Sequence, residues 1–342
     1  MSQTITLIPG DGIGPSIVEA TVQVLEATGV RLDYDCQKAG LAAVDHCDNP
    51  LPDETLDSIR RNRVCLKGPL TTPVGGGYRS VNVTLRQAFK LYANVRPALS
   101  FEGAASRFNS VDLVTVRENT EGLYAGIEHF IKVDERKIAA ESLAIVTREG
   151  SERILRYAFE FARSAGRKKV TLVHKANILK CTSGLFLEIG REMAPEYPDI
   201  RFEERIVDAC CMQLVMNPEQ FDVLVTTNLF GDILSDLAAG LIGGLGLTAG
   251  ANIGVDAALF EAVHGSAPDI ADQGIANPSA MILAGAMMLR HLGERPAADR
   301  VEAAVRTVIR NGECLTPDLR PGSPYGTQDL RDAVIRALKA GE

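Results

Sequence analysis

Hydrophobic residues along this chain recur with two spacings, one typical of buried strands and one typical of amphipathic helices. Short apolar runs occupy residues 4–8, 64–67, 111–116, 143–147, 170–174 and 223–227. Helical spacing is found at residues 16–26, after a capping Ser151, at 277–292, and from Val301 to a stop at Gly312. This alternation predicts an α/β fold with a largely parallel sheet.

The first turn of the chain is rich in glycine. Residues 8–15 read Ile-Pro-Gly-Asp-Gly-Ile-Gly-Pro and lie between a strand and a helix, as a Rossmann dinucleotide-binding turn does. That fingerprint is Gly-x-Gly-x-x-Gly, and counted from Gly10 its third glycine would fall on Pro15. We therefore interpret the segment as a tight turn whose glycines take positive φ.

Length, charge and cysteine usage narrow the class of protein. The 342 residues suffice for about two domains. The net charge of −8 disfavours nucleic-acid and membrane-surface partners, and no run reaches the ~18 apolar residues of a membrane helix. Seven cysteines without paired spacing, and no signal or transit segment, predict reduced thiols and a cytoplasmic location.

Three acidic residues are candidate metal ligands. Asp232 and Asp236 are four residues apart, so on a helix they share one face, where two carboxylates would repel unless a cation lies between them. Mg²⁺ and Mn²⁺ prefer such oxygen ligands. The alternative is a helix cap followed by a solvated surface aspartate. Asp208 stands alone between apolar stretches, where an acid is more often a helix cap than a metal ligand.

A polar and basic stretch predicts an anion site. Ser80 and Asn82 lie near the start of a predicted helix over residues 80–89, where backbone amides favour anions. Arg86, Arg96 and Arg117 can each grip a carboxylate with two hydrogen bonds, so together they suit a tricarboxylate. Taken singly, each arginine also fits a surface ion pair.

Three further segments carry candidate chemistry. Lys175 and Asn177 directly follow a predicted strand, and a desolvated lysine there can act as a base. Tyr124 follows an acidic turn and is either a phenolic acid or a structural tyrosine. The loop from His264 to Ile270 holds Asp269, whose carboxylate can accept hydrogen bonds from a ribose and repel a 2′-phosphate. An exposed turn is the alternative for this loop.

Taken together, these segments resemble the isocitrate and isopropylmalate dehydrogenase family over nearly the whole chain. The matching blocks are residues 8–15, 67–77, 79–97, 117–129, 174–177, 208, 228–236 and 261–277. The resemblance implies a large α/β domain from residues 1–97 and 247–342, and a small domain from 98–246 with the dimer interface and a clasp. It also implies a cofactor site that is not a Rossmann site, and an active site completed by a partner chain.

The resemblance further implies roles for individual residues. Substrate carboxylates would be held by Ser80, Asn82, Arg86, Arg96 and Arg117. Mg²⁺ or Mn²⁺ would be bound by Asp232, Asp236 and the partner's Asp208, with the partner's Lys175 as base and Tyr124 as acid. The cofactor residues would be Lys67, Thr72, Asn177, His264, Gly265, Ala267, Asp269, Ile270 and Asn277.

Two pairs of residues set the expected specificity. Isocitrate enzymes of the family carry a serine and an asparagine where this chain has Ser80 and Asn82, whereas isopropylmalate enzymes carry apolar residues. Relatives that use NADP carry Lys-Tyr in place of Asp269-Ile270. The expected activity is therefore NAD-dependent oxidative decarboxylation of isocitrate by a homodimer. Alternatives are a homoisocitrate, isopropylmalate, tartrate or malate enzyme, a non-catalytic regulatory subunit, or a binding protein without chemistry.

Overall fold

The computed structural model describes residues 2–72, 78, 80–312 and 314–341. Its chain divides into two compact units. The first comprises Met1–Phe89, Leu99–Val111 and Ala239–Glu342, and the second comprises Lys90–Ala98 and Asp112–Ala238. The sequence analysis instead set the domain changes after residues 97 and 246, and that division stays a prediction. Residues 73–77 and Arg79 of the matching blocks lie outside the described residues.

The first unit is built on a mixed sheet in the order β2-β1-β3-β12-β11. Its strands are β1 (Gln3–Ile8), β2 (Leu32–Cys36), β3 (Val64–Lys67), β11 (Ala249–Ile253) and β12 (Ala258–Ala262). Its helices are α1 (Gly14–Glu26), α2 (Leu41–Cys47), α3 (Asp53–Asn62), α4 (Val81–Ala88), α9 (Ser279–His291), α10 (Arg295–Asn311) and α11 (Thr327–Ala340). The pairs β1–β2, β1–β3 and β3–β12 are parallel, and β11–β12 is antiparallel.

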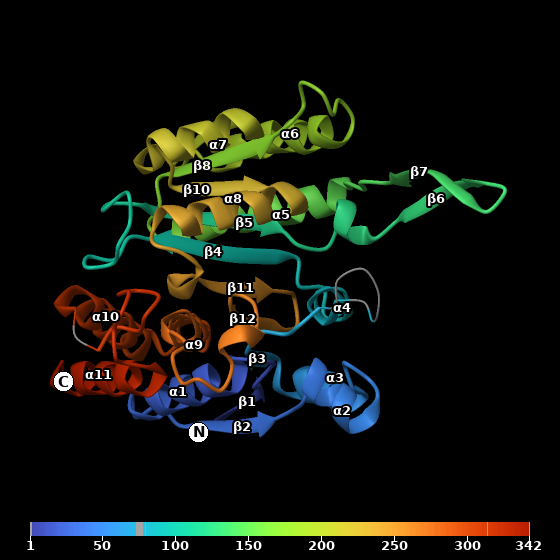
Figure 1. The fold of residues 1–342 in the computed structure, drawn as a ribbon. Coiled ribbons are helices and arrows are strands. Elements are labelled where there is room, and N and C mark those ends of the chain that lie inside the picture. Colours follow the sequence, from blue (N-terminus) through green and yellow to red (C-terminus); the bar gives the residue numbers. More distant parts are fainter. Residues whose placement is uncertain (1, 73–77, 79, 313, 342) are drawn as a thin grey trace. The chain divides into compact units, whose positions relative to one another are not determined.

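Helix α9 is the centre of the first unit's helical layer. It packs on β3, β11 and β12, while α1 and α10 pack against it and α11 packs against α1 and α10 (Figure 1). Nine of its residues are buried, including Met281 and Met288, which explains why its sequence is apolar on nearly every side. Gly312 ends α10 in the left-handed conformation, with φ of 70°, as the sequence predicts.

The glycine turn after β1 is held by close backbone contacts. Gly10 and Gly12 have φ of 83° and 57°, which agrees with the predicted tight turn whose glycines take positive φ. A Cβ at Gly12 would lie 2.0 Å from the carbonyl oxygen of Ser266, and the amide of Ile13 donates to the same oxygen at 2.9 Å. The turn is therefore fixed against the loop that follows β12, within the same unit.

The second unit contains a sheet in the order β4-β5-β10-β8-β9. Its strands are β4 (Ala93–Leu99), β5 (Asp112–Glu118), β8 (Lys169–His174), β9 (Arg201–Ile206) and β10 (Val223–Thr226), with β6 (Glu128–Val133) and β7 (Arg136–Ser142) in a separate antiparallel ribbon. Its helices are α5 (Arg148–Ser164), α6 (Thr182–Met193), α7 (Val207–Met216) and α8 (Asn228–Leu241). The pairs β5–β10, β10–β8 and β8–β9 are parallel.

Helix α5 covers strands β5, β8 and β10, and α6 packs beside it on β8. Every residue of the β6–β7 ribbon is exposed, and the ribbon extends away from the other strands of its unit (Figure 1). Among the described residues, the ribbon therefore has no covering surface within its own unit. Two-stranded ribbons are only marginally stable in water, so packing against another surface would stabilise it.

Two sequence predictions about elements are wrong. The apolar run at residues 143–147 contributes only an isolated bridge between Ile145 and Gly122, because the strand itself is the more polar β7. The helix expected to begin at Ser151 begins earlier: Thr147 is its N-cap, and its hydroxyl accepts from the amide of Gly150. Among the described helices, none is long and apolar enough to cross a membrane.

A pair of alanine substitutions tests the tight turn. Gly29 has φ of 79° but open space around it, whereas Gly12 has both positive φ and a backbone oxygen in the way. We expect Gly29→Ala to lower the free energy of unfolding by about 1 kcal/mol and Gly12→Ala to lower it by about 3 kcal/mol. Urea denaturation followed by circular dichroism measures both, and equal losses would contradict the close approach.

Candidate functional site

Helix α8 carries the two predicted metal-binding aspartates. Strand β10 ends at Thr226 and α8 begins at Asn228, so Asp232 and Asp236 lie in its first turns. Four residues apart on one helix, they project from the same face, as their spacing predicts. Both therefore lie near the carboxyl end of a parallel strand, where functional groups of α/β proteins gather.

Arg117, near the end of β5, is the charged partner of Asp232. Its side chain is 1% exposed, and its Nη1 donates to Asp232 Oδ1. Its Nε and Nη2 donate to Asn228 Oδ1 at 2.9 and 2.7 Å. A Cβ on Gly231 would lie 2.5 Å from Arg117 Cγ, so the glycine lets α8 pass close to the arginine.

Arg96 on β4 faces the same helix. Its Nη1 donates to Ser235 Oγ at 2.7 Å and lies 3.2 Å from Asp236 Oδ1 and 3.4 Å from Asp232 Oδ1. Its Nε is buried and has no hydrogen-bond partner within the described part of the chain. Arg96 therefore keeps a donor for another acceptor, such as a ligand carboxylate.

Tyr124 completes this cluster from a short turn after β5. Its hydroxyl donates to Asp232 Oδ2 at 2.5 Å, and the Arg117 guanidinium lies 5.0 Å from the centre of its ring. Burial raises the pKa of Tyr124, and its hydrogen bond to Asp232 adds to the rise. The phenol is thus kept protonated, which suits a proton donor.

The two aspartates fit a hard divalent cation. Burial raises the pKa of Asp236, although the Arg96 guanidinium opposes this rise. A donor set of carboxylate oxygens matches Mg²⁺ or Mn²⁺ better than it matches zinc. Over residues 2–72, 78, 80–312 and 314–341, no group of three His, Cys, Asp or Glu side chains could hold a metal ion. Within these residues, the site at α8 offers two carboxylates, those of Asp232 and Asp236.

Lys175 and Asp208 form a second cluster in the same unit. Parallel strands β8 and β9 pair His174 with Ile206, so the residues that follow the two strands emerge at one sheet edge. Lys175 Nζ lies 2.5 Å from Asp208 Oδ1, and this hydrogen bond lowers the pKa of Asp208. In the described part of the chain, Asp208 is the one carboxylate within ion-pair distance of Lys175.

Lys67, one of the predicted cofactor residues, is buried in the first unit. Strand register pairs it with Glu261 on β12, and Lys67 Nζ lies 2.8 Å from Glu261 Oε2. Arg86 Nη2 lies 3.8 Å from the other oxygen, which also accepts from Asn252 Nδ2 at 2.7 Å. Burial favours the neutral acid, but Lys67 and Arg86 outweigh it and hold the pKa of Glu261 below its usual range.

Ser80 and Asn82 lie at the start of α4, as predicted. Ser80 is the N-cap residue, yet its side chain caps no amide, and its hydroxyl instead accepts from Thr72 Oγ1 at 3.3 Å. Asn82 Oδ1 is buried without a hydrogen-bond partner among the described residues. A buried amide oxygen left unpaired costs about 1–3 kcal/mol, so this position favours a ligand that donates to it.

Five predicted cofactor residues line one cavity of about 600 Å³ in the first unit. They are His264, Gly265, Ala267, Ile270 and Asn277. The cavity is mostly apolar, as a planar heterocycle requires. His264 Nε2 is buried and unpaired in the described part of the chain, and burial lowers the pKa of His264, so the ring is neutral. These features fit an adenine nucleotide.

Six lining residues of this cavity were not among the predicted cofactor residues: Ile13, Gly246, Ile275, Ala276, Pro317 and Asp318. Ile13 belongs to the glycine turn, and Pro317 and Asp318 belong to a segment without a recognisable pattern. Asn277 Nδ2 donates to Asp318 Oδ2 at 3.0 Å, which fixes this acid at the cavity. For Asp318, the available sequence signal was its position directly after Pro317, in a segment without apolar periodicity.

The remaining predicted cofactor residues lie apart from this lining. Asp269 is exposed in the loop beside the cavity, and Thr72 is exposed near Ser80. Asn177 is exposed in the second unit, after β8. Their roles, and that of Lys67, remain predictions.

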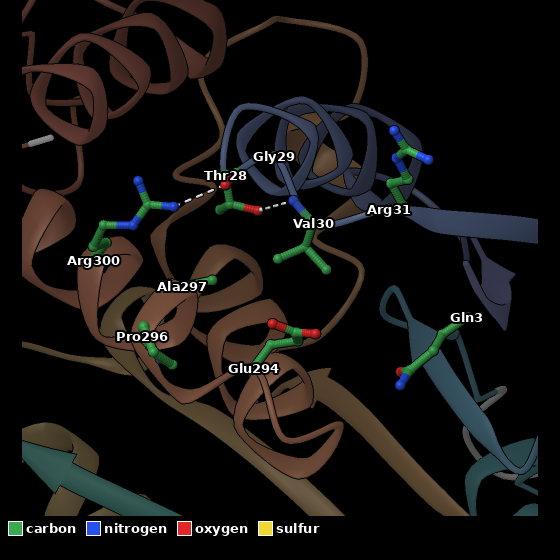
Figure 2. A pocket seen from close by; sticks show the side chains of 9 residues that line it. All are labelled: Gln3, Thr28, Gly29, Val30, Arg31, Glu294, Pro296, Ala297 and Arg300. Atoms are coloured by element: carbon green, nitrogen blue, oxygen red, sulfur yellow. Dashed lines mark hydrogen bonds between the residues drawn. The ribbon is translucent and has the colours of Figure 1, made fainter. Parts of the chain in front are cut away.

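Figure 2 shows another cavity of the first unit, of about 540 Å³, beside the start of α10. Arg300 Nη2 donates to the carbonyl oxygen of Thr28 at 2.8 Å, and the Thr28 hydroxyl accepts from the amide of Val30 at 3.2 Å. These polar groups already serve internal hydrogen bonds. The cavity contains none of the predicted site residues.

Comparisons with known proteins identify the family of the chain. Residues 4–334 match the family model described as isocitrate/isopropylmalate dehydrogenase. The chain is 51% identical over 336 residues (98% of the chain, 88% of the relative) to isocitrate dehydrogenase [NAD] catalytic subunit 5, mitochondrial, of Arabidopsis thaliana. It is 49% identical over 337 residues (98% and 92%) to a mitochondrial regulatory subunit of isocitrate dehydrogenase [NAD] from Dictyostelium discoideum.

A solved structure gives the same result. The crystal structure of isocitrate dehydrogenase from Methylococcus capsulatus superimposes with a TM-score of 0.97 at 75% identity, covering 98% of this chain and 99% of that one. The predicted fold is thereby confirmed. The chain belongs to the isocitrate/isopropylmalate dehydrogenase family.

Proposed function

We propose that this dehydrogenase is an NAD-dependent isocitrate dehydrogenase that uses Mg²⁺ or Mn²⁺ and releases 2-oxoglutarate and CO₂. The observation that carries the proposal is the polar pair Ser80 and Asn82 at the start of α4, whose hydroxyl and side-chain amide N–H groups can donate hydrogen bonds. An alkyl group placed there would leave these polar groups unsatisfied, at about 1–3 kcal/mol each. A substrate carboxylate can instead accept hydrogen bonds from the Ser80 hydroxyl and the Asn82 amide nitrogen.

The three arginines divide the remaining substrate contacts. Arg96 and Arg117 flank the carboxylates of α8, and Arg86 lies in the first unit beside Glu261. Bidentate guanidinium groups suit a substrate with three carboxylates. A tricarboxylate such as isocitrate therefore matches these side chains in charge and in hydrogen-bonding capacity.

The proposed mechanism uses Lys175 and Tyr124 as proton carriers. A cation on Asp232, Asp236 and the partner's Asp208 would supply Lewis-acid polarisation, and NAD⁺ would accept hydride. The substrate hydroxyl gives its proton to the partner's Lys175, and its carbon loses hydride to become a carbonyl. The carboxylate β to this carbonyl then leaves as CO₂. The carbon that retains the electron pair takes a proton from Tyr124.

NAD is the proposed nucleotide because acids border the proposed adenosine cavity. Asp318 lines it, and Asp269 lies in the adjacent loop. A 2′-phosphate would face negative charge there, at a cost that a free ribose hydroxyl avoids.

A homodimer is proposed from apolar side chains of the second unit. Phe130, Val133 and Ile138 on the β6–β7 ribbon are 53–55% exposed, and Met212 and Met216 on α7 are 54% and 69% exposed. Exposed apolar groups of this density mark interaction surfaces. A second copy would cover both surfaces and deliver Lys175 and Asp208 to the partner's site. A cytoplasmic location stays a prediction, since the relatives from Arabidopsis and Dictyostelium are both mitochondrial.

Other functions keep specific support. Homoisocitrate, one methylene longer, also ends in a carboxylate that Ser80 and Asn82 could bind. A regulatory role is favoured by the Dictyostelium relative, but Lys175, Tyr124 and the metal-site aspartates are all present in this chain. Activity measurements separate these functions directly.

The first prediction concerns substrate choice. NADH production should be fastest with isocitrate, NAD⁺ and Mg²⁺ or Mn²⁺, and addition of EDTA should abolish it. We expect kcat/KM for isopropylmalate, tartrate and malate to be at least about 100-fold lower than for isocitrate, because each leaves polar groups unpaired. Faster turnover of isopropylmalate would overturn the role of Ser80 and Asn82, and failure with every acid would favour the regulatory role.

The second prediction concerns the proposed base. Lys175→Met should abolish measurable turnover, since a general base contributes about 10²–10⁴-fold to the rate, while the urea unfolding transition stays in place. Lys180→Met removes an exposed lysine from the same turn and should retain activity. Comparable rates for both variants would exclude Lys175 as the base.

The same variant tests site sharing. In a mixed dimer of Lys175→Met with Asp232→Asn, one of the two sites is intact if Lys175 acts in the partner's site. Co-refolding the two inactive variants should therefore restore about a quarter of wild-type activity, because statistical assembly makes half of the dimers mixed. An inactive mixture that still contains mixed dimers would show that each chain uses its own Lys175.

The third prediction concerns the nucleotide. Asp269→Lys with Ile270→Tyr should raise the ratio of kcat/KM for NADP⁺ to that for NAD⁺ at least about tenfold, since a cation replaces the anion facing the 2′-phosphate. Asp256→Lys makes an equal charge change at an exposed position on the turn between β11 and β12 and should leave the ratio unchanged. An unaltered ratio in the double variant would remove the role of Asp269.

A further inference from the structure

The turn that carries Lys175 is fastened by two buried side chains. His174, the last residue of β8, is 8% exposed, and Ser183, in the first turn of α6, is 3% exposed. The amide of Lys175 donates to Ser183 Oγ at 3.2 Å, and the amide of Ala176 donates to His174 Nδ1 at 3.0 Å. Neither side chain touches the ammonium group; both bind the backbone beneath it.

The remaining backbone group of Lys175 is also occupied. Its carbonyl oxygen accepts from the amides of Ile178 and Leu179, at 3.0 and 2.8 Å. Two acceptors of these bonds, Ser183 Oγ and His174 Nδ1, are side-chain atoms, so the path of the turn depends on the identity of those residues. The same path directs Lys175 Nζ to Asp208 at the start of α7.

His174 can accept the hydrogen bond from the amide of Ala176 only when its imidazole ring is neutral. A protonated imidazole has two donors and no acceptor. Burial lowers the pKa of His174, which keeps Nδ1 available. The nearby Glu204, which would favour protonation, is itself held by Arg191 through contacts of 2.7 and 2.8 Å. Packing around the ring therefore preserves the acceptor.

We infer that His174 and Ser183 are positioning residues that set the pose of Lys175 for proton transfer. A lysine side chain has several rotatable bonds, so the direction of its first bond decides where the ammonium group can reach. A displacement of about 1 Å at a reacting group can cost about 100-fold in rate. The inference rests on the proposed role of Lys175 as the base.

Matched substitutions separate positioning from packing. His174→Phe keeps a buried ring but removes the acceptor, whereas His174→Asn restores an acceptor that can reach the amide two residues on. Ser183→Ala removes the other acceptor with little change in volume. Thr171→Val is the control, because the buried hydroxyl of Thr171 on the same strand has no hydrogen-bond partner among the described residues.

Steady-state kinetics with isocitrate, NAD⁺ and Mg²⁺ provide the test on the full-length protein. We expect kcat to fall about tenfold or more in His174→Phe and Ser183→Ala, with KM for isocitrate changed less than about twofold. His174→Asn should recover kcat to within about threefold of wild type, and Thr171→Val should match wild type. A structural role alone would lower the unfolding midpoint without this split between kcat and KM.

The outcomes distinguish this inference from the proposed function. If the wild type fails to oxidise isocitrate, the proposed function is wrong; if it turns over and Lys175→Met is equally fast, the proposed base is wrong. If Lys175→Met is inactive but His174→Phe and Ser183→Ala keep wild-type kcat, the positioning inference is overturned. Ser183→Ala decides alone if His174→Phe does not fold, with an unchanged kcat again overturning the inference.

Discussion

Burial of the Arg117 guanidinium is the constraint on which the chemical cluster of the second unit depends. A buried charge is tolerated only when its donors are met by well-placed acceptors. Asn228 and Asp232 supply those acceptors from the first turns of α8, and Gly231 between them leaves room for the arginine side chain. The need to pair and accommodate the Arg117 side chain thus accounts for the residue types at Asn228, Gly231 and Asp232. Arg117 fixes Asp232, to which the Tyr124 hydroxyl donates. Arg96 lies within ion-pair distance of both Asp232 and Asp236.

Parallel register explains how residues distant in sequence meet. Thr226 pairs with Arg117, so the helix that follows Thr226 starts beside the arginine. Lys67 pairs with Glu261 across β3 and β12, and their side chains project to the same side of the sheet. His174 and Ile206 similarly bring together the residues after β8 and β9. Each cluster lies at, or directly after, a register pair.

The predictable part of the structure follows from local signals. Helix α8 with its two aspartates, the position of Lys175 after β8 and the stop at Gly312 all follow from spacing or residue type. Strand β7 could not be found this way, because its residues are exposed and carry no apolar run. Thr147 and Ser151 are both good N-caps, and only the path of the preceding chain selects between them.

The missed site residues lacked a local signal for a related reason. Glu261 sits in an otherwise apolar strand, where its carboxylate is tolerated because Lys67 and Arg86 approach it from other elements. Asp318 gains its place from a hydrogen bond with Asn277, across a long sequence separation. Pairing of polar groups over such distances is a property of the folded chain and leaves no periodicity in the sequence.

Separation of the base from the α8 carboxylates has a consequence for how the proposed enzyme would be activated. Lys175 Nζ lies 2.5 Å from Oδ1 of the largely exposed Asp208. If Asp208 acts as a metal ligand in a partner's site, the ion pair has to open, so Lys175 loses its counterion as the metal site is completed. Release of Lys175 from Asp208 and completion of the metal site would then be coupled, because the two side chains are paired after adjacent parallel strands.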